Sequence, residues 1–421
     1  MCVSRAKLMW AVALSVIPLW IQPAGASVLE VPSDHPSINA AIAAAVDGDT
    51  VRVAPGVYVE NLDFLGKAIL VTSHYLAGED WEIVERTVLD GGSPDNPAAA
   101  STVTFRSGEG RDAVLQGFTV TGGRGTEWVD PQFPGYTWRG GGGIFSFRSS
   151  PTIRYTVVSG NRVENSGDVD GAQGGGILAY GGNPVIRNSI ITLNEAEYGG
   201  GLVVDYSGAT VANTAISRNS GGRSYGGGGI WTIGNGDAPI VLSNCVILDN
   251  VSPTRGGAMY LWSSEITVRN SIIWGNAQAE GDPVHGHSGG RASISHSLVE
   301  GGFGGDGNID ADPAFANPVT CLLDRSSPCV DAGHPAAQHH DPEHPAAEGR
   351  ARWPAHGGLR NDMGLYGGPD CTAMGACSAP RSGHGGREAE SPTEIPAHEA
   401  YQSGGGNANG LGLRTPPAAA K

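Results

Sequence analysis

Short runs of apolar residues, alternating with polar ones or continuous, recur along the chain in groups of three. In "GGGILAYGGNPVIRNSIITLN" (174–194) they predict the strands "GGILAY", "PVIR" and "SIITLN", separated by Gly, Asn and Pro turn residues. Further copies occupy 141–161, 199–219, 227–250 and 256–276, with looser copies at 112–123 and 291–302. The period of 25 to 33 residues is too short for a propeller blade, and leucines at fixed offsets are absent, so the pattern predicts a solenoid of another kind.

A single copy cannot bury its apolar face, but stacked copies can. Each strand then pairs in parallel with its equivalents about 4.8 Å above and below. Two columns of aligned apolar residues are predicted to point inward: Ile144, Ile177, Leu202, Ile230 and Met259, and Val158, Ile191, Ile216, Ile247, Ile273 and Val299. The sequence therefore predicts an all-β fold, a parallel β-helix of three-strand coils.

Asparagine recurs at two further positions of each coil. One column separates the second and third strands and the other ends the third strand: Tyr155, Asn188, Asn213, Asn244, Asn270 and His296, and Asn161, Asn194, Asn219, Asn250 and Asn276. Asparagine tolerates the left-handed backbone that a one-residue bend demands. We expect the amides of the first column to hydrogen-bond along the stack, and the second column to do similar work.

The N-terminal region predicts export followed by a helical cap. Residues 1–26 read as a signal peptide with two basic residues, an apolar stretch and small residues before Ser27, although a membrane anchor is the alternative. The β-helix is predicted over 27–302 and begins with a short capping helix. The apolar stripe of this helix comprises Ile38, Ala41, Ile42 and Ala45, and Ser33 or Asp34 is the expected N-cap.

The C-terminal region divides into two further parts. Residues 303–377 form a closing segment with four cysteines, which allow three pairings; the local pairs Cys321–Cys329 and Cys371–Cys377 are the simplest. Residues 378–421 lack periodic apolar positions and are predicted to be a disordered tail.

These motifs resemble proteins of one known fold. The "GG[GA][ILM]" openings and "xxN" strand ends are similar to the repeats of right-handed parallel β-helix proteins, the pectate-lyase-like superfamily and the polymorphic outer-membrane adhesins. "SINAAIAAAVDGDTVRVAPGVYVEN" resembles their N-terminal cap, and "GNIDADPAFANP", "SSPCVDAG" and "DMGLYGG" resemble the closing segment of bacterial surface β-helix proteins named for a variable C-terminal anchor. The resemblance covers roughly residues 27–370 and implies a right-handed helix.

Composition and charge limit the classes of molecule that the chain is expected to bind. The 66 glycines fit a fold rich in turns, and the formal net charge of −16 disfavours nucleic acid and anionic membranes as partners. No apolar run after the signal peptide reaches the roughly 18 to 20 residues that a spanning helix needs, so membrane insertion is not expected. An extracellular or periplasmic location, free or at the cell surface, follows from the predicted export.

Aromatic residues are concentrated on one side of the predicted coils. If the Ile144 column points inward, the alternate positions of the same strands point outward. The five strands of the Ile144 column have two such outward positions each. Six of these ten positions are aromatic, in a chain with 7% aromatic residues: Phe145, Phe147, Tyr180, Trp231, Tyr260 and Trp262. Rings at coil spacing suit stacking on successive sugars, so we interpret them as a carbohydrate-binding platform. The alternative is that loops or a partner chain cover them as a second small core.

Charged residues of the loops and the platform supply candidates for catalysis: Glu127, Asp130, Asp168, Asp170, Glu195, Glu197 and Asp205, with Arg139, Arg223 and Arg255. Acids on adjacent coils would lie about 5 Å apart and acids two coils apart about 9 to 10 Å, which brackets the separations in retaining and inverting glycosidases. The predicted catalytic acids are Asp205 together with Asp170 or Glu197. A lyase would need an arginine as base, because lysine after the signal peptide is confined to Lys67 and Lys421. Ordinary solvation of the loops is the alternative.

One segment carries a calcium signal. "GGFGGDGNIDAD" contains a Gly-Gly-x-Gly-x-Asp unit and offers hard oxygen ligands from Asp306, Asn308, Asp310 and Asp312, although the same residues suit a turn. Calcium is therefore the cofactor to test.

The sequence as a whole predicts an exported β-helix protein that binds an extracellular polysaccharide along its aromatic, loop-walled side. Cleavage of that polysaccharide, by a lyase or glycoside hydrolase, is a further hypothesis. The competing hypothesis is a non-enzymatic surface or secreted adhesin or structural rod.

Overall fold

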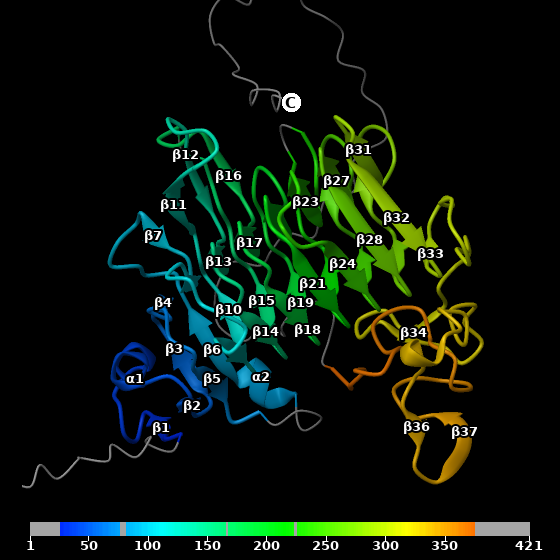
Figure 1. Ribbon diagram of the computed structural model, residues 1–421, viewed down its shortest axis with the longest axis horizontal. Coiled ribbons are helices and arrows are strands. Elements are labelled where there is room, and N and C mark those ends of the chain that lie inside the picture. Colours follow the sequence, from blue (N-terminus) through cyan, green and yellow to red (C-terminus); the bar gives the residue numbers. More distant parts are fainter. Residues whose placement is uncertain (1–25, 76–80, 166, 223–224, 375–421) are drawn as a thin grey trace, which may run out of the picture. The chain divides into compact units, whose positions relative to one another are not determined.

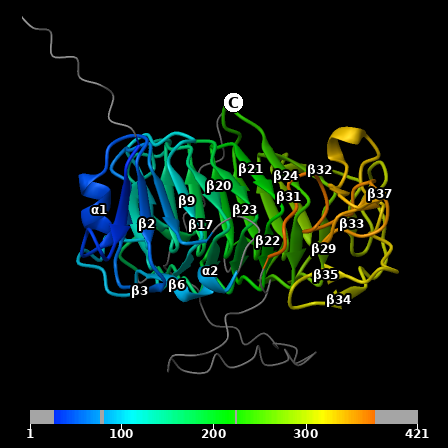
Figure 2. The same ribbon diagram turned by 90° about the horizontal axis from the view of Figure 1, so that it is seen from below.

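Three long parallel β-sheets form the sides of the helix (Figures 1 and 2). The computed structural model describes residues 26–75, 81–165, 167–222 and 225–374. Residues 1–25 of the predicted signal peptide, Cys377 and the predicted tail at 378–421 lie outside the described residues.

Each complete coil contributes one strand to each of the three sheets, which have ten, nine and eight strands. Sheet A comprises β1 (Val28–Val31), β2 (Thr50–Val53), β5 (Leu70–Ser73), β9 (Val114–Gln116), β14 (Thr152–Arg154), β18 (Val185–Arg187), β21 (Ala209–Ala212), β24 (Ile240–Ser243), β28 (Glu265–Arg269) and β32 (Arg291–Ser295). Sheet B comprises β3 (Gly56–Tyr58), β6 (Thr87–Asp90), β10 (Thr119–Thr121), β15 (Val157–Ser159), β19 (Ile190–Thr192), β22 (Ala215–Ser217), β25 (Val246–Leu248), β29 (Ile272–Trp274) and β33 (Leu298–Val299). Sheet C comprises β4 (Leu62–Asp63), β8 (Val103–Phe105), β13 (Ile144–Phe147), β17 (Ile177–Tyr180), β20 (Leu202–Asp205), β23 (Ile230–Ile233), β27 (Met259–Trp262) and β31 (Val284–His287).

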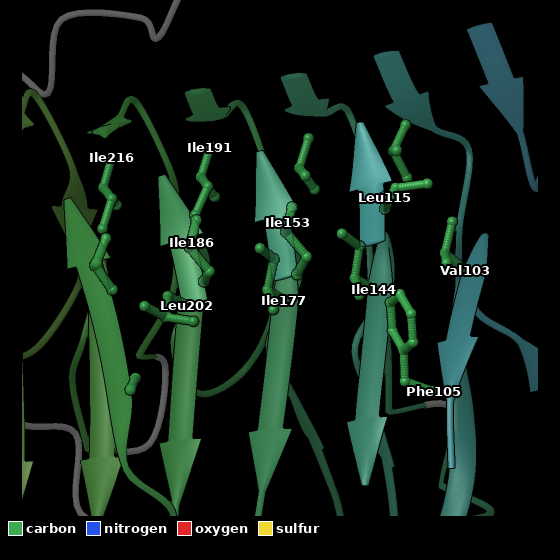
Figure 3. Close-up of a cluster of buried hydrophobic side chains, with 14 of the residues drawn as sticks. Val103, Phe105, Leu115, Ile144, Ile153, Ile177, Ile186, Ile191, Leu202 and Ile216 are labelled. Carbon is green, nitrogen blue, oxygen red and sulfur yellow. The ribbon is translucent and has the colours of Figure 1, made fainter. Parts of the chain in front are cut away.

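The predicted apolar columns form the interior. Both columns belong to one buried cluster that fills the space between the three sheets, and Figure 3 shows members from all three pointing toward one another. The strands pair in the register that the aligned repeats predict: Ile177 of β17 is paired to Ile144 on one side and to Leu202 on the other. The triple glycines lie where coils approach most closely. A Cβ at Gly176 would lie 2.6 Å from the carbonyl oxygen of Gly201 in the next coil.

The asparagine ladder lies on the second of the two predicted columns. Each amide from Asn161 to Asn250 donates through Nδ2 to the Oδ1 of the next, at 2.9 to 3.0 Å. The expectation that the first column would form this ladder is wrong. Asn188, Asn213, Asn244 and Asn270 do adopt the left-handed bend, with φ of 45° to 52°. The side chains of the last three, however, hydrogen-bond to the closing segment.

The N-terminal end of the β-helix and the outer face of sheet B are covered by different segments. Helix α1 (Ile38–Ala44) buries the predicted stripe, but its N-cap is Ser37, whose hydroxyl accepts from the Ala40 N–H at 3.1 Å, instead of Ser33 or Asp34. A second short helix, α2 (Glu82–Arg86), was not predicted. It packs on the outer face of sheet B, and residues Cys321–Met374 of the closing segment cover the same face further along. Cys321 and Cys329 are buried free thiols there, so the predicted local disulfide is not formed.

Candidate functional site

The predicted aromatic platform is a buried layer. The rings do lie on the outer face of sheet C, because they belong to a cluster separate from the interior core. They are nevertheless covered: Tyr260 has no exposed surface, and Trp231 is only 4% exposed. Phe145, Tyr180 and Trp262 are buried as well, and Phe147 is half-buried.

Loop residues form the cover over these rings. β11 (Gly125–Val129) and β12 (Thr137–Gly140) pair as an antiparallel hairpin that joins β7 (Ala99–Ala100) and β16 (Gly171–Gln173) in a small extra sheet. Trp128 of this hairpin contacts the Tyr180 ring at a centroid distance of 4.7 Å, and Tyr198 contacts Trp231 at 5.2 Å. The prediction of an accessible sugar platform therefore needs correction, and the alternative of a second small core describes the arrangement. The reason is that residues between the repeats fold over the rings: the hairpin covers Tyr180 through Trp128, and Tyr198 covers Trp231.

Asp205, one of the predicted catalytic acids, lies inside this aromatic layer. Its carboxyl group is fully buried, and burial followed by the charge of Asp130 raises its pKa well above the ordinary value, while a hydrogen bond with Gln173 opposes the shift. Tyr180 donates its hydroxyl proton to Asp130 Oδ1 at 3.0 Å. Burial thus favours the protonated form of Asp205 and places its carboxyl group beyond the reach of a polymer.

The other two predicted acids lie elsewhere. Asp170 is exposed and accepts a hydrogen bond from the Thr137 backbone at 2.7 Å. Glu197 lines a surface cleft together with Glu195 and Arg162. The three acids therefore contact different neighbours and do not form one catalytic cluster.

A site that is open to solvent lies along the loops between sheet B and sheet C. Two adjoining clefts, of about 840 and 360 Å³, share Arg162 and Glu164, and we call them together the loop groove. Four consecutive coils contribute to its lining: Gly92, Pro94, Pro97 and Ala100; Gly122, Gly123, Arg124 and Arg139; Gly160, Arg162, Val163, Glu164, Asn165 and Asp168; and Glu195, Ala196 and Glu197. The loop groove therefore follows the axis of the helix across several coils.

Ion pairs hold the walls of the loop groove in place. Arg139 Nη2 contacts Glu127 at 2.6 Å and Asp168 at 2.8 Å, which links the hairpin to the loop of the next coil. Arg162 contacts Glu164 at 2.5 Å and Glu195 at 3.3 Å, again across neighbouring coils. Arg124 is exposed and forms no ion pair with any residue in the described ranges, so its guanidinium faces the cleft with free donors.

The sequence pointed to part of this groove. The loop charges singled out include four that line the groove, Arg139, Asp168, Glu195 and Glu197, whereas Arg124, Arg162 and Glu164 were missed. The signal that could have found them is their position in the longest connections, between the third strand of one coil and the first strand of the next. Arg223, another candidate, lies outside the described residues.

The calcium candidates are occupied by local hydrogen bonds. Asp310 Oδ1 accepts from the Gly301 N–H at 3.1 Å, Asp312 Oδ1 from the Ala314 N–H at 2.8 Å, and Asn308 Oδ1 from the Ser297 N–H at 3.1 Å. Within the described ranges, no three His, Cys, Asp or Glu side chains are grouped so that they could hold a metal ion. The calcium hypothesis stays a prediction, since these oxygens already accept hydrogen bonds from backbone N–H groups.

Comparison with known proteins agrees with this architecture. Residues 135–299 match the family model described as "Right handed beta helix region". The chain is a right-handed parallel β-helix, as predicted. No sequence among the curated proteins matches it.

Solved structures with a similar fold share little sequence with this chain. Pectate lyase Pel9A has a TM-score of 0.46 at 14% identity, with 82% of this chain and 96% of that chain covered. A pectin methylesterase in complex with hexasaccharide VII has a TM-score of 0.39 at 12% identity, covering 70% and 94%. Pectin methylesterase PemA from Erwinia chrysanthemi has a TM-score of 0.30 at 12% identity, covering 68% and 82%. Likeness at this level concerns the fold alone.

The helices of the described residues are short. None has the length and apolar content that crossing a membrane would require.

Proposed function

We propose that this chain is an exported β-helix protein that binds an extracellular polysaccharide in the loop groove. The observation that carries the proposal is the extent of the groove: two clefts that share Arg162 and Glu164 and draw their walls from four consecutive coils. An extended polymer can contact several coils at once in such a groove, whereas a compact ligand would fill only one cleft. The ion pairs that fix the walls reduce the entropy lost on binding, because the side chains are already ordered.

The chemistry of the lining suits a polar ligand. Arg124, Arg139 and Arg162 alternate with carboxylates, so hydroxyl groups of sugars would find both donors and acceptors. The buried rings of Trp231 and Tyr260 have no direct part in this binding. Polar contacts, instead of stacking on the aromatic residues of sheet C, carry the recognition in this proposal.

The test is binding of a polysaccharide panel to the mature chain, measured by affinity electrophoresis and calorimetry. We expect Arg124→Ala to weaken binding at least tenfold. Arg111→Ala is the matched control, because Arg111 is exposed and does not line the groove. Loss of binding in both variants, or in neither, would remove the loop groove from consideration.

Cleavage is not part of this proposal, because the predicted acids do not converge. The same panel is to be examined for released reducing or unsaturated ends. Release that disappears in Glu197→Gln would add cleavage to the proposal, since Glu197 is the one predicted acid that lines the groove. Export is tested separately by N-terminal sequencing of the protein recovered outside the cytoplasm, with Ser27 expected as the first residue.

The second candidate function is a non-enzymatic adhesin or structural rod. Burial of the aromatic rings under loops favours it, since a rod needs no accessible sugar platform. In that case the panel gives no polysaccharide binding, while attachment of expressing cells to a surface or to other cells falls when the protein is deleted.

A further inference from the structure

A third cleft, of about 220 Å³, lies at the corner between sheet A and sheet B, away from the loop groove. The helix supplies Arg154, Tyr155, Arg187 and Asn188 to its walls, and the closing segment supplies Arg352, Pro369, Asp370, Cys371 and Thr372. Its volume equals that of several water molecules at about 30 Å³ each. Three guanidinium groups therefore meet one carboxylate in a small space, in a chain whose net charge is −16.

The backbone forces two of these arginines together. Arg154 ends β14 and Arg187 ends β18, and the two residues are direct partners in the parallel ladder. Like charges directly opposite each other on neighbouring strands destabilise a sheet unless something compensates them. Arg154 Nε donates to Gln116 Oε1 at 2.6 Å, and no described carboxylate forms an ion pair with Arg154, Arg187 or Arg352. Positive charge is thus in excess here: Asp370 is the one carboxylate of the lining, and within the described residues it forms no ion pair with these arginines.

Three buried polar atoms of residues that line this cleft point to a ligand. Arg187 Nε, Asn188 Oδ1 and Thr372 Oγ1 are shielded from solvent and have no hydrogen-bond partner within the described part of the chain. Asn188 is 2% exposed, so an unpartnered amide oxygen there is costly. Rotation of that amide can present either its oxygen or its NH2 group, and the threonine hydroxyl can donate as well as accept.

We propose that this corner cleft binds a small tetrahedral oxyanion, a sulfate or phosphate group. Arg187 and Arg154 would hold it from the helix and Arg352 from the closing segment, with Thr372 and Asn188 completing the contacts. Guanidinium groups match such oxygens with paired hydrogen bonds. Because the cleft has walls from both segments, the anion also fastens residues 352–372 to the coils that carry Arg154 and Arg187. The site is independent of the loop groove.

The test is calorimetric titration of the mature chain with sodium sulfate and with sodium phosphate, in a chloride buffer of constant ionic strength. We expect saturable binding of one anion per chain. Arg187→Gln and Arg352→Gln should each weaken it at least tenfold. Arg111→Gln is the control, because Arg111 is exposed and lies outside both clefts. Arg352 is exposed, so its variant keeps the test valid if Arg187→Gln fails to fold.

Two sources of the anion are distinguished by a further arm, a sulfated disaccharide beside the inorganic salts. Tighter binding of the ester indicates a glycan substituent as the ligand, and tighter binding of the free anion indicates an inorganic ligand; both results support the site. Absence of saturable binding, or equal binding by wild type and both glutamine variants, would overturn the proposal and leave ordered water as the partner of these atoms.

Discussion

Removing one amide from the asparagine ladder provides the sharpest test of the fold. Asn219 is fully buried at the centre of the ladder. Its Oδ1 accepts from the backbone N–H and the Nδ2 of Asn194, and its own Nδ2 donates to Ile191 O and to Asn250 Oδ1, each at 3.0 Å. Asn219→Ala removes all four hydrogen bonds in one step.

The magnitude follows from these contacts. A buried hydrogen bond contributes a net ~1 kcal/mol, so four sum to about 4 kcal/mol. The loss of stability is smaller than this sum, because two neighbouring amides keep other hydrogen bonds. Asn194 Nδ2 still donates to Val158 O, and Asn250 Oδ1 still accepts from the backbone N–H of residue 219. The Asn194 N–H, however, loses its acceptor inside the protein, which alone costs about 1 to 3 kcal/mol. We therefore expect the free energy of unfolding to fall by roughly 3 to 4 kcal/mol.

The assay is guanidinium chloride unfolding followed by tryptophan fluorescence. Asn235→Ala is the control, because Asn235 is exposed and accepts one hydrogen bond, from the Glu265 N–H. Its cost should stay within about 0.5 kcal/mol. Asn219→Asp in its protonated form keeps the acceptor and one donor, so at low pH its stability should lie between those of the wild type and the alanine variant. A loss below about 1 kcal/mol in Asn219→Ala would refute the reasoning that the ladder stabilises the coils.

Three further predictions follow from the site. Burial raises the pKa of Asp205, so the folded state keeps this proton at a pH where the unfolded chain has released it, and stability falls as pH rises from about 4 upward. The free energy of unfolding of Asp205→Asn, relative to that of the wild type, should therefore increase between pH 4.5 and pH 8 in urea melts. A difference that stays constant over this range would contradict the prediction. Trp231→Ala should cost about 3 to 5 kcal/mol in unfolding free energy, while Trp353→Ala, with a 60% exposed ring, should cost little; equal costs would show that the ring layer is not a packed core. EDTA should leave the melting temperature unchanged, and a rise on adding millimolar calcium would instead support ligation by Asp306, Asn308, Asp310 and Asp312.

The interior of the helix was predictable because its pattern repeats. Ile177, Leu202 and Ile230 occupy equivalent places after the same glycines, and a parallel ladder with a fixed coil length leaves them one way to align. The same logic identified both asparagine columns. It could not decide which of them forms the ladder, because both offer the same side chain after a strand. The difference comes from the closing segment: Asn213 Nδ2 donates to Leu365 O, 152 residues away in sequence.

The candidate site was less predictable, for a physical reason. The alternation of residues along the strands correctly predicted that Trp231 and Tyr260 point outward. Whether these rings are exposed to solvent depends on whether the loops between the repeats cover them. The hairpin of β11 and β12 pairs Trp128 with Trp138 across its strands, and the repeat pattern does not predict this pairing because the hairpin lies outside the repeats. The prediction therefore failed at the one layer that is built from non-repeating residues.

The three corners of the coils differ in how much change they tolerate. Sheet A passes into sheet B through a one-residue left-handed bend such as Asn213, so an insertion there would break the register of both sheets. Sheet C passes into sheet A through connections as short as Trp262 to Glu265. Sheet B passes into sheet C through long loops, from Thr121 to Ile144 between β10 and β13. Because long surface loops lengthen at small entropic cost, residues specific to one coil accumulate at this third corner. The loop groove lies there, and a search for function in related helices should begin at the same corner.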